Sequence, residues 1–113
     1  MHEMALTASV IDVIEQQARA QNFSRVLCVR LEIGAISHVE PDAMAFCFEA
    51  VAQGTIAEGA RLEIDRSPGL ARCESCGKNV EIAARYEPCP LCGRHGLKIT
   101  GGDQMRIKDL EVV

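Results

Sequence analysis

The stretch CESCGKNVEIAARYEPCPLCG, residues 73–93, decides the fold of the second half of this chain. It holds two Cys-x-x-Cys pairs, Cys73/Cys76 and Cys89/Cys92, with twelve residues between the pairs. Each pair brackets a tight turn that directs both sulfurs toward one point. The glycine after each pair lets the backbone wrap closely around a metal without a Cβ clash. Two such turns facing each other supply the four thiolates of a closed tetrahedral zinc site. We therefore predict one structural Zn(II), bound by these four cysteines.

A four-cysteine site by itself leaves several functions open. The segment CPLCG, residues 89–93, also resembles a rubredoxin knuckle, so a rubredoxin-like iron electron-transfer protein is one alternative. A zinc-ribbon interaction module is another, although the net charge of −4 and the absence of an aromatic stacking platform argue against nucleic acid as its partner. The sequence shows no nucleophile–base constellation and no phosphate-binding loop, so we expect no enzyme.

Length and composition bound the fold class. The 113 residues fit one domain, or a small domain with a smaller appendage. No apolar run approaches the roughly 20 residues that a transmembrane helix needs, and the N-terminal segment lacks the features of a secretory signal. Six cysteines in such a chain indicate metal ligands and buried thiols rather than disulfides, with Cys28 and Cys47 as the buried pair. We expect a cytoplasmic protein that binds no membrane.

Helical and strand periodicities precede the cysteine segment. Apolar residues at helical spacing, beginning with Met4, predict a helix over residues 4–21 that ends at Asn22. Residues 27–33 alternate apolar and polar side chains, which predicts a strand with Leu27 as its first inward residue. A second helix should begin at Pro41, carry Met44 on its buried face and close at Gly54, and a strand should follow at residues 62–64.

The last apolar segment, residues 105–112, lies beyond the cysteines, and its alternation slips at Lys108-Asp109, as a β-bulge would cause. We expect this strand to return to the first part of the chain and to pair with the first two strands. The predicted fold class is α/β: two helices on a three-stranded sheet, with an inserted zinc-ribbon-like domain. The predicted domains are an α/β domain, residues 1–69 and 102–113, and a zinc-binding domain, residues 70–101.

Three motifs occur in a fixed order along the chain. It begins Met1-His2-Glu3-Met4, and its middle carries Glu32-Ile33-Gly34 followed by Val39-Glu40-Pro41-Asp42-Ala43-Met44. The paired cysteines are followed by Ile107-Lys108-Asp109-Leu110-Glu111-Val112. Together these motifs closely resemble the HypA/HybF family of nickel metallochaperones, which help to mature nickel–iron hydrogenases, and the resemblance covers essentially the whole chain.

The resemblance implies delivery of Ni(II) to the large-subunit precursor of the hydrogenase, together with a HypB-type GTPase as partner. It implies that residues 1–69 and 102–113 form a nickel-binding domain, that His2 is the essential nickel ligand and that Glu3 tunes this site. An acidic residue near the start of the second helix is also implicated in some members. Glu40 is the nearest match here, although Asp is the commoner residue. Whether the chain forms a homodimer is left open by the sequence.

Coordination chemistry supports a site at the first two residues. The Met1 α-amine, the His2 backbone nitrogen and the His2 imidazole can close two fused chelate rings, which suits square-planar Ni(II). The fourth ligand stays open among Glu3, Glu40, His38, His95 and water. Because an α-amine titrates near pH ~8 and must lose its proton to bind, we expect nickel binding to weaken as the pH falls.

Overall fold

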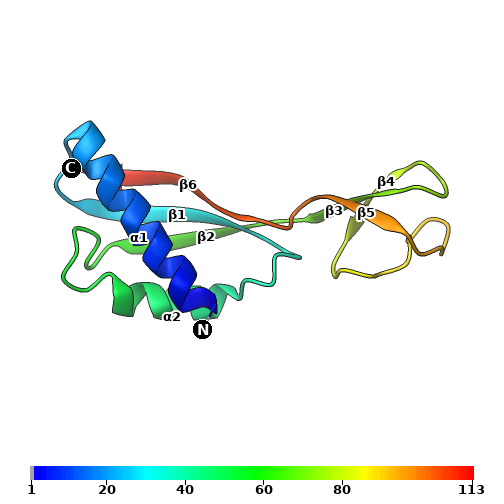
Figure 1. The fold of residues 1–113 in the computed structure, drawn as a ribbon, viewed down its shortest axis with the longest axis horizontal. Helices are drawn as coiled ribbons and strands as arrows, with labels where there is room; N and C mark the ends of the chain where they lie inside the picture. The colour runs from blue at the N-terminus through cyan, green and yellow to red at the C-terminus, as the bar shows by residue number, and fades with distance from the viewer. Residues whose placement is uncertain (1) are drawn as a thin grey trace.

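The first sheet is built around β1 (Val26–Gly34), which lies between the two other strands in the order β2-β1-β6. The strand β2 (Arg61–Ser67) runs parallel to β1, and β6 (Met105–Val112) runs antiparallel to it. The helices α1 (His2–Gln21) and α2 (Pro41–Val51) lie on one face of this sheet (Figure 1). This confirms the predicted arrangement of two helices on three strands.

The second sheet carries the cysteine segment. In this computed structural model, which describes residues 2–113, the strand β3 (Gly69–Cys73) lies between β4 (Asn79–Ile82) and β5 (Leu97–Gly101) and is antiparallel to both. The alternating segments Val80-Glu81-Ile82 and Leu97-Lys98-Ile99 predict short strands where β4 and β5 lie, whereas no strand is predicted at β3. The molecule measures 52 × 27 × 17 Å, because the second sheet extends from one end of the first (Figure 1).

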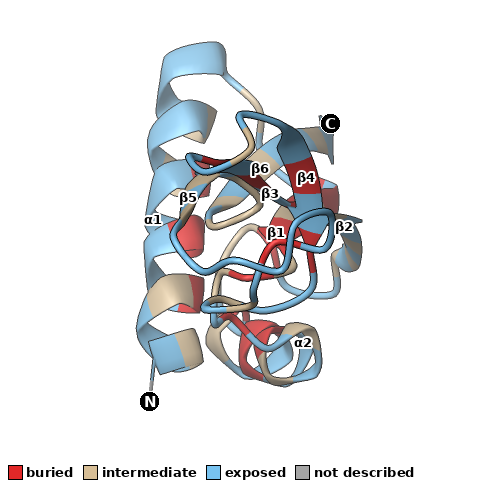
Figure 2. Cartoon of the chain, turned by 90° about the vertical axis from the view of Figure 1, so that its right-hand side faces the viewer, coloured by how far each residue is buried: buried red, intermediate tan, exposed pale blue. Residues whose placement is uncertain are grey.

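Each sheet has its own hydrophobic core. The larger core joins the inner faces of both helices to the first sheet, and its fully buried side chains include Ile14, Leu31, Ile33 and Met44. Figure 2 shows the buried positions of α1 and α2 on the sides that face the sheet. The smaller core contains Ile36, Ala71, Cys73, Val80, Ile82 and Cys89. Two separate cores are the physical basis for describing two modules.

Two details of the first module differ from the periodicity predictions. Leu27 is 46% exposed, because a register shift between Val26 and Cys28 turns Val26 to the core instead. Met4, which has the spacing of a core residue, is 37% exposed near the start of α1. The buried face of α1 is instead formed by Thr7, Val10, Ile11 and Ile14.

The ends of the elements follow the sequence signals closely. Asn22 has a left-handed φ of 59° directly after α1, as predicted. The helix α2 begins at Pro41 but ends at Val51, before Gly54. The strand β6 shows the predicted bulge, since Asp109 pairs with Arg30 while the next residue of β1 pairs with Ile107. It returns to β1 alone and forms an edge of the sheet.

The two sheets meet at a narrow junction of backbone hydrogen bonds. The N–H of Gly34 donates to the carbonyl of Gln104 at 2.9 Å, and the N–H of Ile36 donates to the carbonyl of Gly102 at 3.0 Å. A Cβ atom on Gly34 would collide with the Gly102 carbonyl, so glycine is needed where these segments cross. No helix within residues 2–113 is long and apolar enough to cross a membrane.

Candidate metal centres

The sulfur atoms of the four paired cysteines converge, and all lie within 4.8 Å of one another. The Cys73 and Cys92 sulfurs are 3.6 Å apart, and the Cys76 and Cys89 sulfurs are 3.9 Å apart. A tetrahedral zinc with Zn–S bonds of about 2.3 Å requires sulfur–sulfur distances of about 3.8 Å. The donor set and its spacing therefore fit a four-thiolate zinc site.

Local backbone geometry produces this convergence. In the first pair, the N–H of Gly77 donates to the Cys73 carbonyl at 2.7 Å, and in the second pair the N–H of Gly93 donates to the Cys89 carbonyl at 2.8 Å. Both glycines have positive φ, 72° and 78°, which other residues adopt only with strain. The two turns have the same hydrogen-bond pattern, as the repeated Cys-x-x-Cys-Gly sequence predicts.

The environment of the cluster favours ionisation of one of its thiols. The backbone N–H of Cys76 lowers the pKa of Cys73 to about 6, against the opposing effect of desolvation. The backbone N–H of Arg94 lowers the pKa of Cys92, but desolvation and the neighbouring sulfurs outweigh it and raise that pKa to about 11. A divalent cation at the centre would favour the thiolate form of all four.

The start of α1 contacts the start of α2. His2 is the first residue of α1, its side chain is 60% exposed, and its Nδ1 lies 3.9 Å from Glu3 Oε2. The same Glu3 oxygen accepts a hydrogen bond from the backbone N–H of Glu40 at 3.3 Å. Glu40 caps α2, because its own carboxylate accepts from the N–H of Asp42 at 3.2 Å. Met1 lies outside the described residues.

The Glu3 carboxyl is held in its ionised form. Its own backbone N–H and the N–H of Glu40 lower its pKa below the ordinary value, and His2 adds a smaller effect in the same direction. At neutral pH the exposed His2 imidazole therefore has a carboxylate beside it. This places one nitrogen donor and one oxygen donor together at the start of α1.

The two remaining histidine candidates lie in different places. His38 has a φ of 64°, is exposed, and lines an open cavity of about 300 Å³ together with Glu40, Arg66 and Arg85. His95 follows the second cysteine turn and lines a separate cavity of about 230 Å³ in the second module. The structure thus places Glu3 beside His2 and Glu40 against Glu3, with His38 two residues before Glu40, and it places His95 in the second module.

Sequence reasoning missed two residues that join the modules. Ile36 follows β1, yet its side chain is only 3% exposed because it is buried in the second core, beside Ala71, Cys73 and Ile82. Its carbonyl accepts a hydrogen bond from Nε of Arg85 at 3.1 Å. Neither residue belongs to a motif or a clear periodicity, so no sequence signal marks them.

Comparison with known proteins agrees with this arrangement. Residues 1–112 match the family model described as HypA, hydrogenase/urease nickel incorporation, metallochaperone. The chain is 60% identical to the hydrogenase maturation factor HypA of Rhodopseudomonas palustris, and 57% identical to the hydrogenase maturation factor HypA 2 of Bradyrhizobium diazoefficiens. Each alignment spans 112 residues and 99% of both chains.

A solved structure shows the same fold. The solution structure of the Ni metallochaperone HypA from Helicobacter pylori is similar with a TM-score of 0.72, over 98% of this chain and 97% of that chain, at 24% sequence identity. The fold similarity and the match over nearly the whole sequence lead to one assignment. The chain belongs to the HypA family of nickel metallochaperones, which are not enzymes.

Proposed function

We propose that this chain binds Ni(II) at its N-terminus and delivers it during maturation of nickel–iron hydrogenase, while a structural Zn(II) occupies the four-cysteine site. The contact between Glu3 and Glu40 supports the nickel site best. It holds the start of α1 against the start of α2, with the exposed His2 imidazole beside an ionised carboxylate. An exposed site of this kind can receive and release its cargo.

The proposed ligands are the Met1 α-amine, the His2 backbone nitrogen and the His2 imidazole. The first N–H groups of a helix have no partner within the helix, so the His2 nitrogen can bind a metal without breaking a helical hydrogen bond. The fourth position is proposed for Glu3, Glu40, His38 or water. His95 is a weaker candidate, since it lies beside the cysteine turns of the second module.

The proposed zinc has a structural role. Four thiolates complete its coordination and leave no open position for a substrate. The cysteine turns contribute Cys73 and Cys89 to the small second core, so metal binding and packing stabilise the same module. The proposed partners are a HypB-type GTPase and the hydrogenase large-subunit precursor, in the cytoplasm, with Ni(II) as the cargo.

Calorimetric titration of tag-free, zinc-loaded protein with Ni(II) tests the function. We expect His2→Ala to weaken nickel binding at least 100-fold, about 2.7 kcal/mol, while zinc content and circular dichroism stay unchanged. His95→Ala is the comparison variant, because it removes an exposed histidine of the other module: wild-type affinity would exclude His95 as the fourth ligand, and we expect its loss of affinity to be smaller than that of His2→Ala in either case. Tight binding by the His2→Ala protein would contradict the proposal.

A one-residue extension before Met1 tests the amine separately. The extension converts the amine nitrogen into an amide and destroys the fused chelate rings, but it leaves the imidazole in place. We expect an affinity loss of at least tenfold, about 1.4 kcal/mol. Unchanged affinity would remove the amine from the ligand set without excluding a site centred on His2.

A further inference from the structure

Two arginines from different modules line one cavity at the junction of the two sheets. Arg66 lies near the end of β2 in the first module, and Arg85 follows β4 in the second. Both border the open cavity of about 300 Å³ that His38 and Glu40 also line. Neither arginine belongs to the cysteine site or to the proposed nickel ligands, so the metal centres do not explain why these two cations meet.

The alternation of β2 sets the position of Arg66. Leu62 and Ile64 pack against the core that the helices cover, and the pairing of β2 with β1 is regular over this stretch. Residues two apart in a strand lie on the same face, so Arg66 continues the series of Leu62 and Ile64. At the end of β2 this series passes beyond the core, and Arg66 is exposed at the wall of the cavity.

The guanidinium of Arg85 is held by the loop that follows β1. Its Nε donates to the carbonyl of Ile36 at 3.1 Å, and Ile36 is itself buried in the second core. A guanidinium also carries N–H donors on Nη1 and Nη2, and these make no hydrogen bond within residues 2–113. The half-buried Arg85 therefore presents positioned donors to the cavity.

No carboxylate of residues 2–113 forms an ion pair with these two arginines. The cations of the exposed sheet face differ, because each of them reaches a carboxylate: Arg30, Arg61, Arg106 and Lys108. The acidic residue that lines the cavity is Glu40, and its carboxylate accepts from the N–H of Asp42 instead. Two cations against one carboxylate leave the cavity wall with an excess of positive charge.

The charge and the walls of the cavity define the ligand that fits. A guanidinium matches the two oxygens of a carboxylate through parallel N–H···O bonds. The carboxylate of Glu40 disfavours a ligand with several negative charges, such as a phosphate dianion. The rest of the wall is formed by apolar side chains, which suit a short aliphatic stem: Ala35, Ile36, Val39, Ala83 and Ala84.

We propose that this cavity binds a carboxylate on a short aliphatic stem, held between Arg66 of the first module and Arg85 of the second. The same chemistry occurs in an Asp or Glu side chain of a protein segment and in a free alkyl carboxylic acid. The bound group adds ion pairs from both modules to a junction that backbone hydrogen bonds otherwise hold. Figure 1 shows the loop after β1, which the ligand contacts, running back from the junction to α2.

Titration of zinc-loaded, nickel-free protein with butyrate tests the site. The Nε–H signals of the arginines in 15N NMR spectra report binding, sodium chloride keeps the ionic strength constant, and uncharged butyramide is the blank. The peptide acetyl-Gly-Glu-Gly-amide presents the same group on a protein segment, with its Gln counterpart as the blank. We expect saturable shifts of the Arg66 and Arg85 signals with the carboxylates in the millimolar range and none with the blanks.

The two arms identify the source of the carboxylate. Tighter binding of the peptide than of butyrate supports a protein segment, and the reverse supports a free acid; both results support the site. The absence of a saturable shift with either probe overturns the proposal. Because nickel is absent from these titrations, their outcome is independent of the nickel site proposed above.

Replacement of each arginine separates a built site from general surface charge. We expect Arg66→Gln and Arg85→Gln to weaken carboxylate binding at least tenfold, about 1.4 kcal/mol. The Arg66 side chain makes no hydrogen bond or ion pair within residues 2–113, so the fold should not change. Arg85→Gln also loses the bond to Ile36, and zinc content and the Ile36 amide signal check its junction.

Two further variants complete the test. Arg19→Gln is the matched control, because Arg19 is an exposed arginine in the last turn of α1 and does not line the cavity. It should bind like the wild type. Glu40→Gln removes the opposing charge but keeps an acceptor oxygen for the α2 cap, so binding should become tighter. An equal loss in Arg19→Gln and Arg66→Gln, or weaker binding by Glu40→Gln, would overturn the proposal.

Discussion

At the scale of single residues, Ile36 joins the cysteine module to the loop that leads to α2. Its side chain is buried in the core that holds Cys73 and Cys89, while its backbone belongs to the loop that leads to α2. Four residues further on, the N–H of Glu40 holds the carboxylate of Glu3 beside His2. The segment of residues 36–40 therefore connects the cysteine module to the start of α1, and it does not include His95.

Shortening Ile36 tests its role in the second core. Ile36→Ala removes a side chain that is 3% exposed, and we expect a loss of about 2–5 kcal/mol in the unfolding free energy of the second module. Ile36→Val, which deletes one methylene, should cost about 0.5–1.5 kcal/mol. Denaturant titration of the zinc-loaded protein measures both. Equal stability of the Ala variant and the wild type would show that this side chain does not stabilise the module.

Single cysteine substitutions test the zinc ligands. We expect Cys76→Ala to lose its zinc and to unfold the second module, because metal binding and folding of such a module are coupled. Cys47→Ala removes a buried thiol of α2 instead and should keep one zinc per chain. Elemental analysis measures the zinc content per chain of both proteins. A folded Cys76→Ala protein with a full equivalent of zinc would rule out this ligand set.

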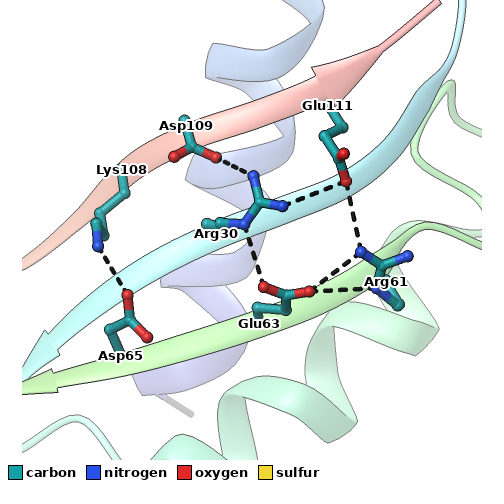
Figure 3. A network of polar contacts seen from close by, with 7 residues as sticks. All are labelled: Arg30, Arg61, Glu63, Asp65, Lys108, Asp109 and Glu111. Carbon is teal, nitrogen blue, oxygen red and sulfur yellow. Dashed lines mark hydrogen bonds and ion pairs between the residues drawn. The ribbon is translucent and has the colours of Figure 1, made fainter.

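At the scale of elements, the exposed face of the first sheet is joined by ion pairs (Figure 3). Arg30 of β1 reaches Glu63 of β2 at 3.1 Å and Asp109 of β6 at 2.6 Å, so one side chain connects all three strands. Lys108 of β6 contacts Asp65 of β2 at 2.7 Å. Single exposed ion pairs contribute little, but a shared network holds each charge among several partners. The face opposite the helices is therefore polar and crossed by ion pairs that link its three strands.

The network predicts a pH dependence of stability. Lys108 lowers the pKa of Asp65 below its ordinary value, mainly through a hydrogen bond. A carboxyl with a lowered folded pKa stabilises the protein above its unfolded pKa, near ~4, and that contribution is lost as the pH falls through the folded pKa. We expect Asp65→Asn to lower the midpoint of thermal unfolding at pH 7. The difference from the wild type should disappear in acid, once the pH lies below the folded pKa of Asp65.

The comparison between variant and wild type removes the effect of zinc release, which acid causes in both proteins. Added salt should also reduce the difference at pH 7, because exposed charges are screened. Differential scanning calorimetry across pH and salt measures both dependences. A difference that persists unchanged in acid would mean that Asp65 stabilises the fold by something other than its charge.

At the scale of the whole molecule, two cores are joined by one narrow junction. The chain leaves the first module after β2 and returns in β6, and Ile36 reaches across from the loop after β1. We propose residues 70–101 as the zinc-binding unit and residues 1–69 and 102–113 as the nickel-binding unit. The second core is small, so we expect it to depend on the proposed zinc, whereas the first has two helices packed on its sheet.

Metal removal should therefore act on one module. After treatment with a strong chelator, we expect the amides of β3, β4 and β5 to lose their protection from hydrogen exchange, while β1 and α1 keep theirs. Hydrogen exchange followed by mass spectrometry, with zinc-reloaded protein as the control, resolves the two parts. Simultaneous loss of protection in both modules would show that they unfold as one unit.

The sequence by itself determined the features that depend on neighbours in the chain. The cysteine turns follow from Cys-x-x-Cys-Gly, α1 and α2 follow from helical spacing and from Pro41, and the bulge in β6 follows from the phase slip at Lys108-Asp109. Each of these is set within a few residues by backbone geometry or side-chain periodicity. The motifs that carry the family resemblance are local in the same sense.

The tertiary structure decided which distant segments meet. The contact of Glu3 with Glu40 spans 37 residues, and that of Ile36 with Arg85 spans 49. The strand β3 is defined by its partners β4 and β5, and its short segment has no distinctive periodicity of its own. Leu27 is exposed only because β1 bulges against β6. Such features arise when separate elements pack and pair. The order of side chains along one segment does not specify which distant segment it will contact.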